Sequence, residues 1–431
     1  MAKEQPQIAN KQDEIVVIKD IVKAVRQTPD VYIGVLGNIG FLSMIREIVQ
    51  NSCDEIAKGN SIDKTVIVSY DERTRAVIVE DFGQGIPLDL LEVVFSTLHS
   101  SSNYNKQDGS GRYSSGKNGV GGSITNFLSS FFIVESYRED GTAARAEFIE
   151  GHISPKGLQK IKCPKGRHGL LVTFAPTDMV GVTEVTTREV EYMLWQQAHM
   201  YPIGTTIIYN SIDLAGNVNR VKLVNKAGID EMLHTICEKN LYEACRIYTD
   251  NGTKAFECIF TYDLNNMTDM NIMSFANMCA TTGGYHVNGF VDAVIKFMRD
   301  YMNKVFLVNN KKLQISAQDI RTGLRAVVSC KSLHPLFEGQ AKTEYAEKDM
   351  YNYAYTATYS AIDSWAKKFP NDLQKLCKYL KEVCEARTKL DDEKIKIRDK
   401  YVSNALSGGL PAKYKPANGK GPFEAIICEG L

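Results

Sequence analysis

The chain has no excess of charge of either sign. Its 51 lysines and arginines equal its 51 aspartates and glutamates, so the formal net charge is zero. This balance excludes a protein that coats nucleic acid through overall positive charge, and any DNA contact must come from a local surface. A long apolar run and a secretory signal pattern are also missing from the sequence. We therefore expect a cytoplasmic protein with no membrane partner.

The cysteine pattern excludes a zinc site. The ten cysteines include no C-x-x-C pair and have no ligand-like spacing with the seven histidines. Such cysteines are typical of reduced core thiols in an intracellular protein. The sequence has no internal repeat or low-complexity tract, and 431 residues are enough for two or three domains.

A predicted helix near residue 50 carries the first candidate site. Apolar residues at helical spacing between 42 and 56 predict an amphipathic helix that ends near Gly59. Glu47, Asn51 and Asp54 point the same way because they are four and three residues apart. A carboxylate and a carboxamide on one face can hold a water molecule and a hard cation such as Mg2+. The simpler alternative is that these residues form only the solvated face of the helix.

The second candidate site follows a predicted hairpin. Alternating valines at 66, 68, 77 and 79 predict two strands joined by a turn at 71–74. The second strand ends in Asp81-x-Gly83-x-Gly85-Ile86-Pro87. Glycines let the backbone pass close to a flat ligand, and the aspartate can accept a hydrogen bond from an exocyclic amine. The alternative is a plain Asp-Gly turn.

The third candidate site is the glycine-rich loop Gly116-Lys117-Asn118-Gly119-Val120-Gly121, which leads into an apolar run. A loop of this kind offers unpaired N–H groups to phosphate. The loop fits neither the Rossmann fingerprint nor a Walker loop. The polar stretch before it, residues 100–115, is expected to be a mobile lid or disordered.

Taken in order, these motifs resemble the GHKL ATPase superfamily, and further stretches resemble gyrase B, topoisomerase IV B and related type IIA DNA topoisomerases. These are A-V-R-Q-T-P-D-V-Y-I-G at 24–34, T-T-G-G-Y-H-V-N-G-F at 281–290, D-I-R-T-G-L at 319–324, G-Q-A-K-T at 339–343 and E-A-I-I-C-E-G at 424–430. The resemblance spans nearly the whole chain.

The resemblance implies an α+β protein. Residues 1–220 would form a GHKL (Bergerat) α/β-sandwich ATPase domain that begins with a dimerisation arm. Residues 221–402 would form an α+β transducer domain ending in a long helix. The sequence itself predicts a long charged helical segment from about 349 to 402, with a break at Phe369-Pro370-Asn371. Residues 403–431 would be a linker and the first strand of a TOPRIM fold.

The resemblance also assigns roles to the site residues. Glu47 would be the general base for the attacking water, and Asn51 would bind Mg2+, with Asp54 in a supporting role near the nucleotide. Lys342 and Gln340 would reach the γ-phosphate of ATP. Asp81 would accept a hydrogen bond from the adenine amine. The pocket wall and the phosphate cradle would be formed by Gly83, Gly85, Ile86, Pro87, Lys117, Asn118, Gly119, Val120 and Gly121.

The implied function is the ATP-hydrolysing subunit of a type IIA DNA topoisomerase, in which ATP-driven homodimerisation closes the gate through which DNA enters. The partners would be double-stranded DNA and a gyrase-A-like breakage-reunion subunit or domain. We expect the remaining TOPRIM region and the cleavage tyrosine to lie elsewhere, either because the chain is truncated or because the enzyme is split between genes. Supercoiling, relaxation and decatenation all stay open, and the protein would lie with the nucleoid, or in the host cytoplasm if it is viral.

Two departures from the family pattern keep alternatives open. Leu170 replaces a threonine that helps to read adenine, and Ala341 replaces the threonine of the Q-T-K loop. These changes indicate a divergent branch and give some support to a nucleotide-sensing, DNA-clamping module without turnover. Intact Glu47, Asn51 and Lys342 oppose that alternative. A MutL-like ATPase clamp is the other rival, which the topoisomerase form of 281–290 and 339–343 disfavours.

Overall fold

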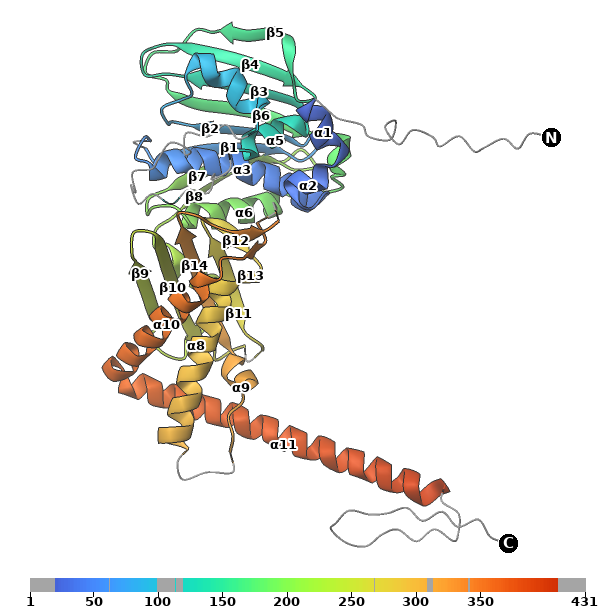
Figure 1. Cartoon of the computed structure of the whole chain (residues 1–431), viewed down its shortest axis with the longest axis vertical. Coiled ribbons are helices and arrows are strands. Elements are labelled where there is room, and N and C mark those ends of the chain that lie inside the picture. Colours follow the sequence, from blue (N-terminus) through green and yellow to red (C-terminus); the bar gives the residue numbers. More distant parts are fainter. Residues whose placement is uncertain are drawn as a thin grey trace, which may run out of the picture.

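The structure is a computed structural model that describes residues 20–61, 63–98, 113, 119–266, 268–307, 313–339 and 342–409, with side chains as far as 401. Two β-sheets with their helices follow one another along the chain, and a long helix extends from the second (Figure 1). We refer to residues 20–224 as the N-terminal half and to residues 225–409 as the C-terminal half.

The N-terminal half is built on an eight-stranded sheet with the order β5-β4-β3-β6-β2-β1-β7-β8. Its neighbouring strands are antiparallel except for the parallel pair β1 and β7. The strands are β1 (Thr65–Asp71), β2 (Ala76–Asp81), β3 (Ser129–Tyr137), β4 (Ala143–Ile149), β5 (His152–Lys160), β6 (Gly169–Pro176), β7 (Thr206–Ile212) and β8 (Val218–Val224). The predicted hairpin is confirmed as β1 and β2.

Helices pack on this sheet and on one another (Figure 1). They are α1 (Ile21–Gln27), α2 (Pro29–Ile33), α3 (Asn38–Ala57), α4 (Leu91–Ser96), α5 (Gly121–Phe127) and α6 (Thr187–His199), with short 3-10 helices at Leu88–Leu90 and Asp178–Val180. The predicted amphipathic helix is α3, whose apolar stripe is buried in the core. It ends where expected, because Gly59 has a φ of 79° and supplies the left-handed conformation that closes a helix.

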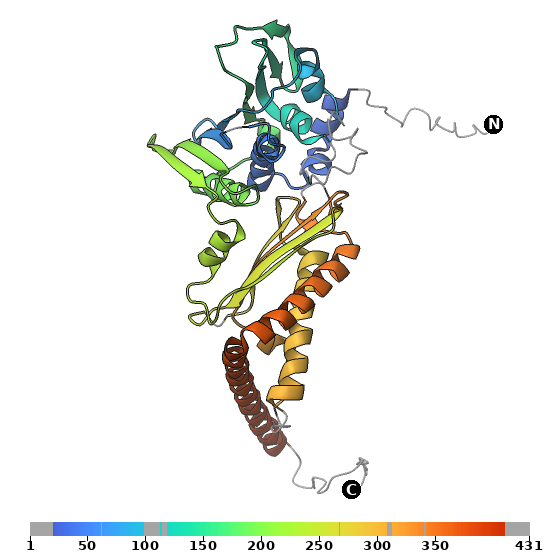
Figure 2. The same cartoon turned by 90° about the vertical axis from the view of Figure 1, so that its left-hand side faces the viewer.

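The C-terminal half is built on a five-stranded sheet with the order β12-β11-β14-β10-β9. Its strands are β9 (Cys245–Asp250), β10 (Lys254–Tyr262), β11 (Asn271–Ala276), β12 (Cys279–Thr281) and β14 (Leu324–Ser332). The helices are α7 (Ile229–Ile236), α8 (Tyr285–Tyr301), α9 (Ala317–Arg321), α10 (Asp349–Lys368) and α11 (Pro370–Gly409), with a π-helical turn at Met302–Phe306. Helices α8 and α10 pack on one face of the sheet, and α7 lies on the other (Figure 2).

The central strands of this second sheet contribute side chains to two hydrophobic cores, one on each face. Ile259 and Val327 point into the core shared with the N-terminal half, whereas the next residues, Phe260 and Val328, point into the core beneath α8 and α10. This follows from the two-residue period of a strand. The two halves are therefore joined by packed side chains as well as by the chain.

A small third sheet lies at the junction of the halves. It has the order β13-β16-β15, with β13 (Gly283–Gly284), β15 (Phe337–Glu338) and β16 (Glu344–Tyr345). The hairpin of β15 and β16 holds the loop that contains Lys342, and β13 pairs with β16 in parallel. The predicted boxes at 281–290 and 339–343 meet beside this sheet, where the backbone N–H of Thr282 donates to the carbonyl oxygen of Thr343 at 2.7 Å.

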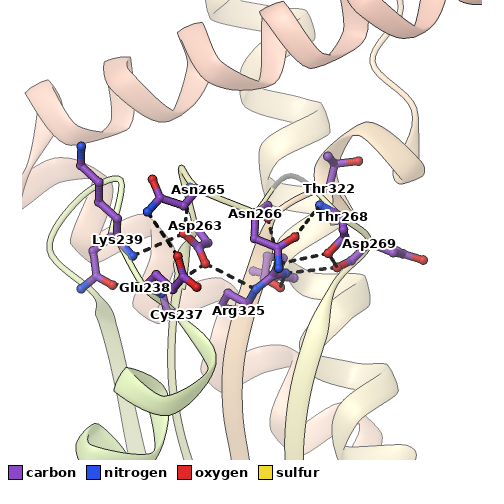
Figure 3. A network of polar contacts seen from close by, with 12 residues as sticks. Cys237, Glu238, Lys239, Asp263, Asn265, Asn266, Thr268, Asp269, Thr322 and Arg325 are labelled. Carbon is purple, nitrogen blue, oxygen red and sulfur yellow. Dashed lines mark hydrogen bonds and ion pairs between the residues drawn. The ribbon is translucent and has the colours of Figure 1, made fainter.

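A buried polar network ties together the loops at the opposite end of the second sheet (Figure 3). The guanidinium of Arg325, which is 1% exposed, donates to the carbonyl oxygens of Asn266 at 2.8 Å and Asp269 at 3.1 Å. Its Nε lies 4.0 Å from the carboxylate of Asp263, which also accepts from the backbone N–H of Asn265 at 3.0 Å. These bonds satisfy a cation that would otherwise be costly to bury.

The long charged segment predicted after residue 349 is helical. The break predicted at 369–371 is confirmed, because α10 ends at Lys368 and α11 begins at Pro370. The domain limits stay predictions, and the one placed at 220/221 falls inside β8. Nearly all of the expected arm (residues 1 to about 20), most of the expected lid and the expected TOPRIM strand lie outside the described residues. Within the described part of the chain, no helix is both long and apolar enough to cross a membrane.

Candidate active site

Glu47 and Asn51 lie one turn apart on α3, on its side toward the start of α5. The side chain of Glu47 is 17% exposed, and Asn51 is exposed. Asp54 is placed differently, because it is buried and accepts a hydrogen bond from the hydroxyl of Tyr201 at 2.7 Å. The structure therefore brings Glu47 and Asn51 together, while Asp54 faces α6 and the residues that follow it.

Lys342 reaches this site from the C-terminal half. Its Nζ lies 2.7 Å from Oε1 of Glu47, although 295 residues separate the two in the sequence. Burial by itself would raise the pKa of Glu47, but the ammonium of Lys342 outweighs burial and lowers it. Burial likewise opposes the charge of Lys342, and the carboxylate of Glu47 raises its pKa overall. Both groups are therefore charged and form an ion pair between the two halves.

The end of the glycine-rich loop lies directly against Glu47. Helix α5 begins at Gly121, and a Cβ atom at that position would overlap the carboxylate of Glu47. Gly119 has a φ of 56°, a conformation that glycine adopts easily. Val120 lies between them and is 8% exposed. The two remaining residues of the expected phosphate cradle, Lys117 and Asn118, lie outside the described residues.

Asp81 is a buried acceptor at the end of β2. It is 4% exposed, and its Oδ1 accepts from the backbone N–H groups of Gly83 at 3.0 Å and Leu170 at 3.1 Å. Its Oδ2 accepts from the hydroxyl of Ser52 on α3 at 3.0 Å. Burial raises its pKa to about 6, because desolvation outweighs these hydrogen bonds. Residue 170 makes this contact through its backbone, so its change to leucine leaves the bond to Asp81 in place.

The segment from Gly83 to Pro87 forms a rigid edge beside Asp81. Gly85 has a φ of 67°, and a Cβ there would meet the carbonyl oxygen of Tyr137 on β3. Ile86 is held at both backbone groups by Ser136: its N–H donates to Oγ at 2.9 Å and its carbonyl accepts from that hydroxyl at 2.8 Å. Pro87 precedes the 3-10 helix at Leu88–Leu90.

The sequence predictions missed three polar residues of this region: Ser52, Ser136 and Gln50. A signal existed for two of them, since Ser52 and Gln50 fall on the buried side of the helical stripe, where a polar residue needs a partner. Ser136 lies on a strand and could not have been linked to Ile86 without the tertiary structure. Gln340 and Ala341 lie outside the described residues, so the predicted contact of Gln340 stays a prediction.

The donor set near α3 suits Mg2+. One carboxylate and one carboxamide, Glu47 and Asn51, stand next to the expected phosphate loop, and Mg2+ is usually held by few protein ligands plus substrate phosphates. Among the described residues, no group of three or more His, Cys, Asp or Glu side chains could hold a metal on its own.

Comparisons with known proteins agree with this geometry. Residues 39–193 match the family model described as histidine kinase-, DNA gyrase B- and HSP90-like ATPase. The N-terminal half therefore has the GHKL ATPase fold. Residues 221–396 match the model for DNA gyrase B. Most of the C-terminal half is therefore similar to DNA gyrase B.

Individual relatives support the assignment over most of the chain. The DNA gyrase B protein of Treponema denticola is 28% identical over 434 residues, which cover 97% of this chain and 66% of the relative. The DNA topoisomerase 4 B protein of Streptococcus pneumoniae is 29% identical over 356 residues, which cover 79% of this chain and 53% of the relative. The chain thus spans between half and two thirds of the length of these relatives.

Solved structures show the same fold. The 43K ATPase domain of Thermus thermophilus gyrase B, solved with an aminocoumarin, has a TM-score of 0.65 and 25% identity, covering 87% of this chain and 98% of that one. The ATPase region of Saccharomyces cerevisiae topoisomerase II has a TM-score of 0.63 and 20% identity, covering 86% and 100%.

Proposed function

We propose that this chain is the ATP-binding and ATP-hydrolysing part of a type II DNA topoisomerase. The observation that carries the proposal is the ion pair of Glu47 and Lys342, which joins a candidate base to a candidate phosphate ligand across the two halves. The matches to the DNA gyrase B model and to the GHKL ATPase model support it. In this proposal Asp81 accepts a hydrogen bond from the adenine amine, next to the wall formed by Gly83, Gly85, Ile86 and Pro87.

The ion pair suggests how hydrolysis depends on the nucleotide. Lys342 is a compact cation that suits a terminal phosphate. If the γ-phosphate draws Lys342 away, Glu47 is released to accept a proton from the attacking water. Asn51 would hold Mg2+, which supplies charge neutralisation at the phosphates when it is bound. The chain's own groups therefore position the nucleotide and switch the base.

The partners follow from the same proposal. They are duplex DNA, a second copy of this chain in the ATP state, and a gyrase-A-like breakage-reunion subunit. The expected site of action is the cytoplasm, with the DNA. A nucleotide-sensing module without turnover is the alternative, and intact Glu47, Asn51 and Lys342 weigh against it.

The test is Mg2+-dependent ATP turnover by the purified chain, with and without duplex DNA. Glu47→Ala should abolish turnover and retain ATP binding, because it removes the base and no phosphate contact. Asn51→Ala should instead weaken Mg2+-dependent binding of ATP. Turnover by Glu47→Ala near the wild-type rate would remove Glu47 as the base. ATP binding without turnover by the wild type would favour the sensing module.

A further inference from the structure

A tight turn of the second sheet packs against α3, the helix that carries Glu47. Asn277 and Met278 form this turn between β11 and β12, with φ values of 43° and 63°. Left-handed backbone is uncommon for residues with side chains and costs free energy, so surrounding contacts must hold it. Met278 is 4% exposed and belongs to the apolar core of the N-terminal half.

Two buried glutamines of the N-terminal half donate hydrogen bonds to this turn. Gln50, on α3 between Glu47 and Asn51, is 1% exposed, and its Nε2 donates to the carbonyl oxygen of Met278 at 3.3 Å. Gln197 on α6 is 3% exposed and donates to the same carbonyl oxygen at 3.3 Å. Nε2 of Gln50 also lies 3.1 Å from Oε1 of Gln197.

The other side of the turn is fastened to β14. The side-chain amide of Asn277 donates to the carbonyl oxygen of Ser332 at 2.8 Å, and its Oδ1 accepts from the N–H of Ser332 at 2.8 Å. Its own backbone N–H donates to the carbonyl oxygen of Cys330 at 2.8 Å. Ser332 is the last residue of β14, after which the chain runs through β15 to Lys342.

Apolar packing between the halves is incomplete beside this turn. A cavity of about 270 Å³ lies beside the turn and is lined from both sides, by Leu42, Gln197 and Phe275 among others. Hydrogen bonds have defined lengths and directions, whereas apolar contact is non-directional. The bonds of Gln50 and Asn277 are therefore the contacts that can define how α3 lies relative to the end of β14.

We propose that Gln50 and Asn277 are positioning residues for ATP hydrolysis, acting as a second link between α3 and β14 that sets where Lys342 meets Glu47. The inference rests on the proposed function. Both links start within one turn of α3, at Glu47 and Gln50. The first ends at Lys342, and the second ends at Ser332, the last residue of β14. Without the second link, the backbone that carries Lys342 can shift relative to Glu47. The flexible side chain of Lys342 cannot then hold a single position against Glu47.

Two variants test this in the full chain. Asn277→Gly removes both side-chain bonds to Ser332 and keeps a residue that tolerates positive φ. Gln50→Leu replaces the amide with an apolar group of similar size. In both we expect kcat for ATP to fall by a factor on the order of ten or more, as misplacement of a reacting group requires. The dissociation constant of ADP should change by less than about twofold, because ADP lacks the γ-phosphate.

The matched control is Asn225→Ala. Asn225 is also 1% exposed and also makes two side-chain amide bonds, to Tyr201 and Gly228, and neither bond reaches the turn or β14. Thermal unfolding of all variants separates lost stability from lost positioning. The control should lower the melting temperature and leave kcat unchanged. Equal losses of kcat in the control and the test variants would overturn the inference.

A second measurement asks whether the link acts through Lys342. In a Lys342→Ala background, Asn277→Gly should cause no further loss of kcat, because residues that act as one unit are not additive. Full additivity would overturn the inference, and so would a wild-type kcat in both single variants. If the wild type shows no ATP turnover, the proposed function fails and this inference with it. A wild type that hydrolyses ATP beside unaffected variants overturns the inference alone.

Discussion

Asp81 combines a functional acceptor with a cost to stability. Burial raises its pKa to about 6, whereas an unfolded aspartate titrates near about 3.9. Between these values the folded chain holds a proton that the unfolded chain has released. The free energy of unfolding should therefore fall as the pH rises from about 4 to about 6, and stay level above that range. In the proposed function, the adenine amine binds this buried carboxylate.

Asp81→Asn should separate the two effects. The amide can still accept from Gly83 and Leu170 and can donate to the hydroxyl of Ser52, so the fold is retained and the pH dependence between about 4 and 6 is lost. Its NH2 group is a donor and cannot accept a hydrogen bond from the adenine amine, so the affinity for ADP should fall by about 10- to 100-fold. Thermal unfolding against pH and ADP titration measure these outcomes. Wild-type ADP affinity in this variant would exclude Asp81 as the adenine acceptor.

Lys342→Ala tests the other half of the residue-scale mechanism. We expect hydrolysis to fall on the order of 100-fold, since a charge that stabilises the transition state is lost. ADP affinity should stay nearly unchanged. Without this ammonium, the effect of burial is no longer offset by Lys342, and the pKa of Glu47 rises. Because the base must be deprotonated, the residual activity should need a higher pH. Lys348→Ala, an exposed lysine six residues on, is the control and should behave as wild type. Equal losses of ATP-analogue and ADP affinity would contradict a γ-phosphate contact.

At the scale of elements, the contact of α5 with α3 leaves no room for a side chain. A Cβ at Gly121 would overlap the carboxylate of Glu47. Gly121→Ala should therefore displace Glu47 and lower kcat on the order of tenfold. Stability should change little, because alanine favours a helix more than glycine does. Gly283→Ala is the control, since a Cβ there meets nothing within 4 Å. Full activity of Gly121→Ala would mean that Glu47 can move without consequence for hydrolysis.

A strong ion pair helps to hold the long helix α11 on the C-terminal half. The guanidinium of Arg387 binds both carboxylate oxygens of Asp319 on α9, at 2.7 and 3.0 Å. Burial opposes the charge of Asp319, but Arg387 lowers its pKa overall. Asp319 belongs to the D-I-R-T-G-L stretch, so this part of the family pattern positions the exit of α11 from the C-terminal half.

At the scale of the whole molecule, the halves are connected where the nucleotide is expected to bind. ATP would bridge them, because Asp81 and the glycine loop belong to one half and Lys342 to the other. A nucleotide that binds a closed, paired state better than the open one shifts the population toward that state.

A non-hydrolysable ATP analogue should therefore convert the chain to a dimer. Light scattering at protein concentrations well above micromolar measures the mass directly. ADP should leave the chain monomeric, because it cannot recruit Lys342, and Lys342→Ala should weaken the response to the analogue. A monomer at saturating analogue would argue against a gate operated by ATP.

Several features follow from the sequence because their causes are local. The apolar period of α3, the alternation and turn of β1 and β2, and the break before Pro370 depend on neighbours a few residues away. The Glu47 and Asn51 pair is likewise defined by the geometry of one helix. Family motifs added Lys342 as a candidate for the same site.

Other features were decided only by the tertiary structure. The 2.7 Å contact of Lys342 with Glu47 joins residues 295 apart, and the bond of Leu170 to Asp81 joins two strands of one sheet. Asp54 accepts a hydrogen bond from the hydroxyl of Tyr201, 147 residues away in the sequence, and its supporting role near the nucleotide stays a prediction. Gln50 and Asn277 become linked only because the turn of β11 and β12 docks on α3. Such contacts depend on how whole sheets pack, and the order of side chains along one element does not contain that information.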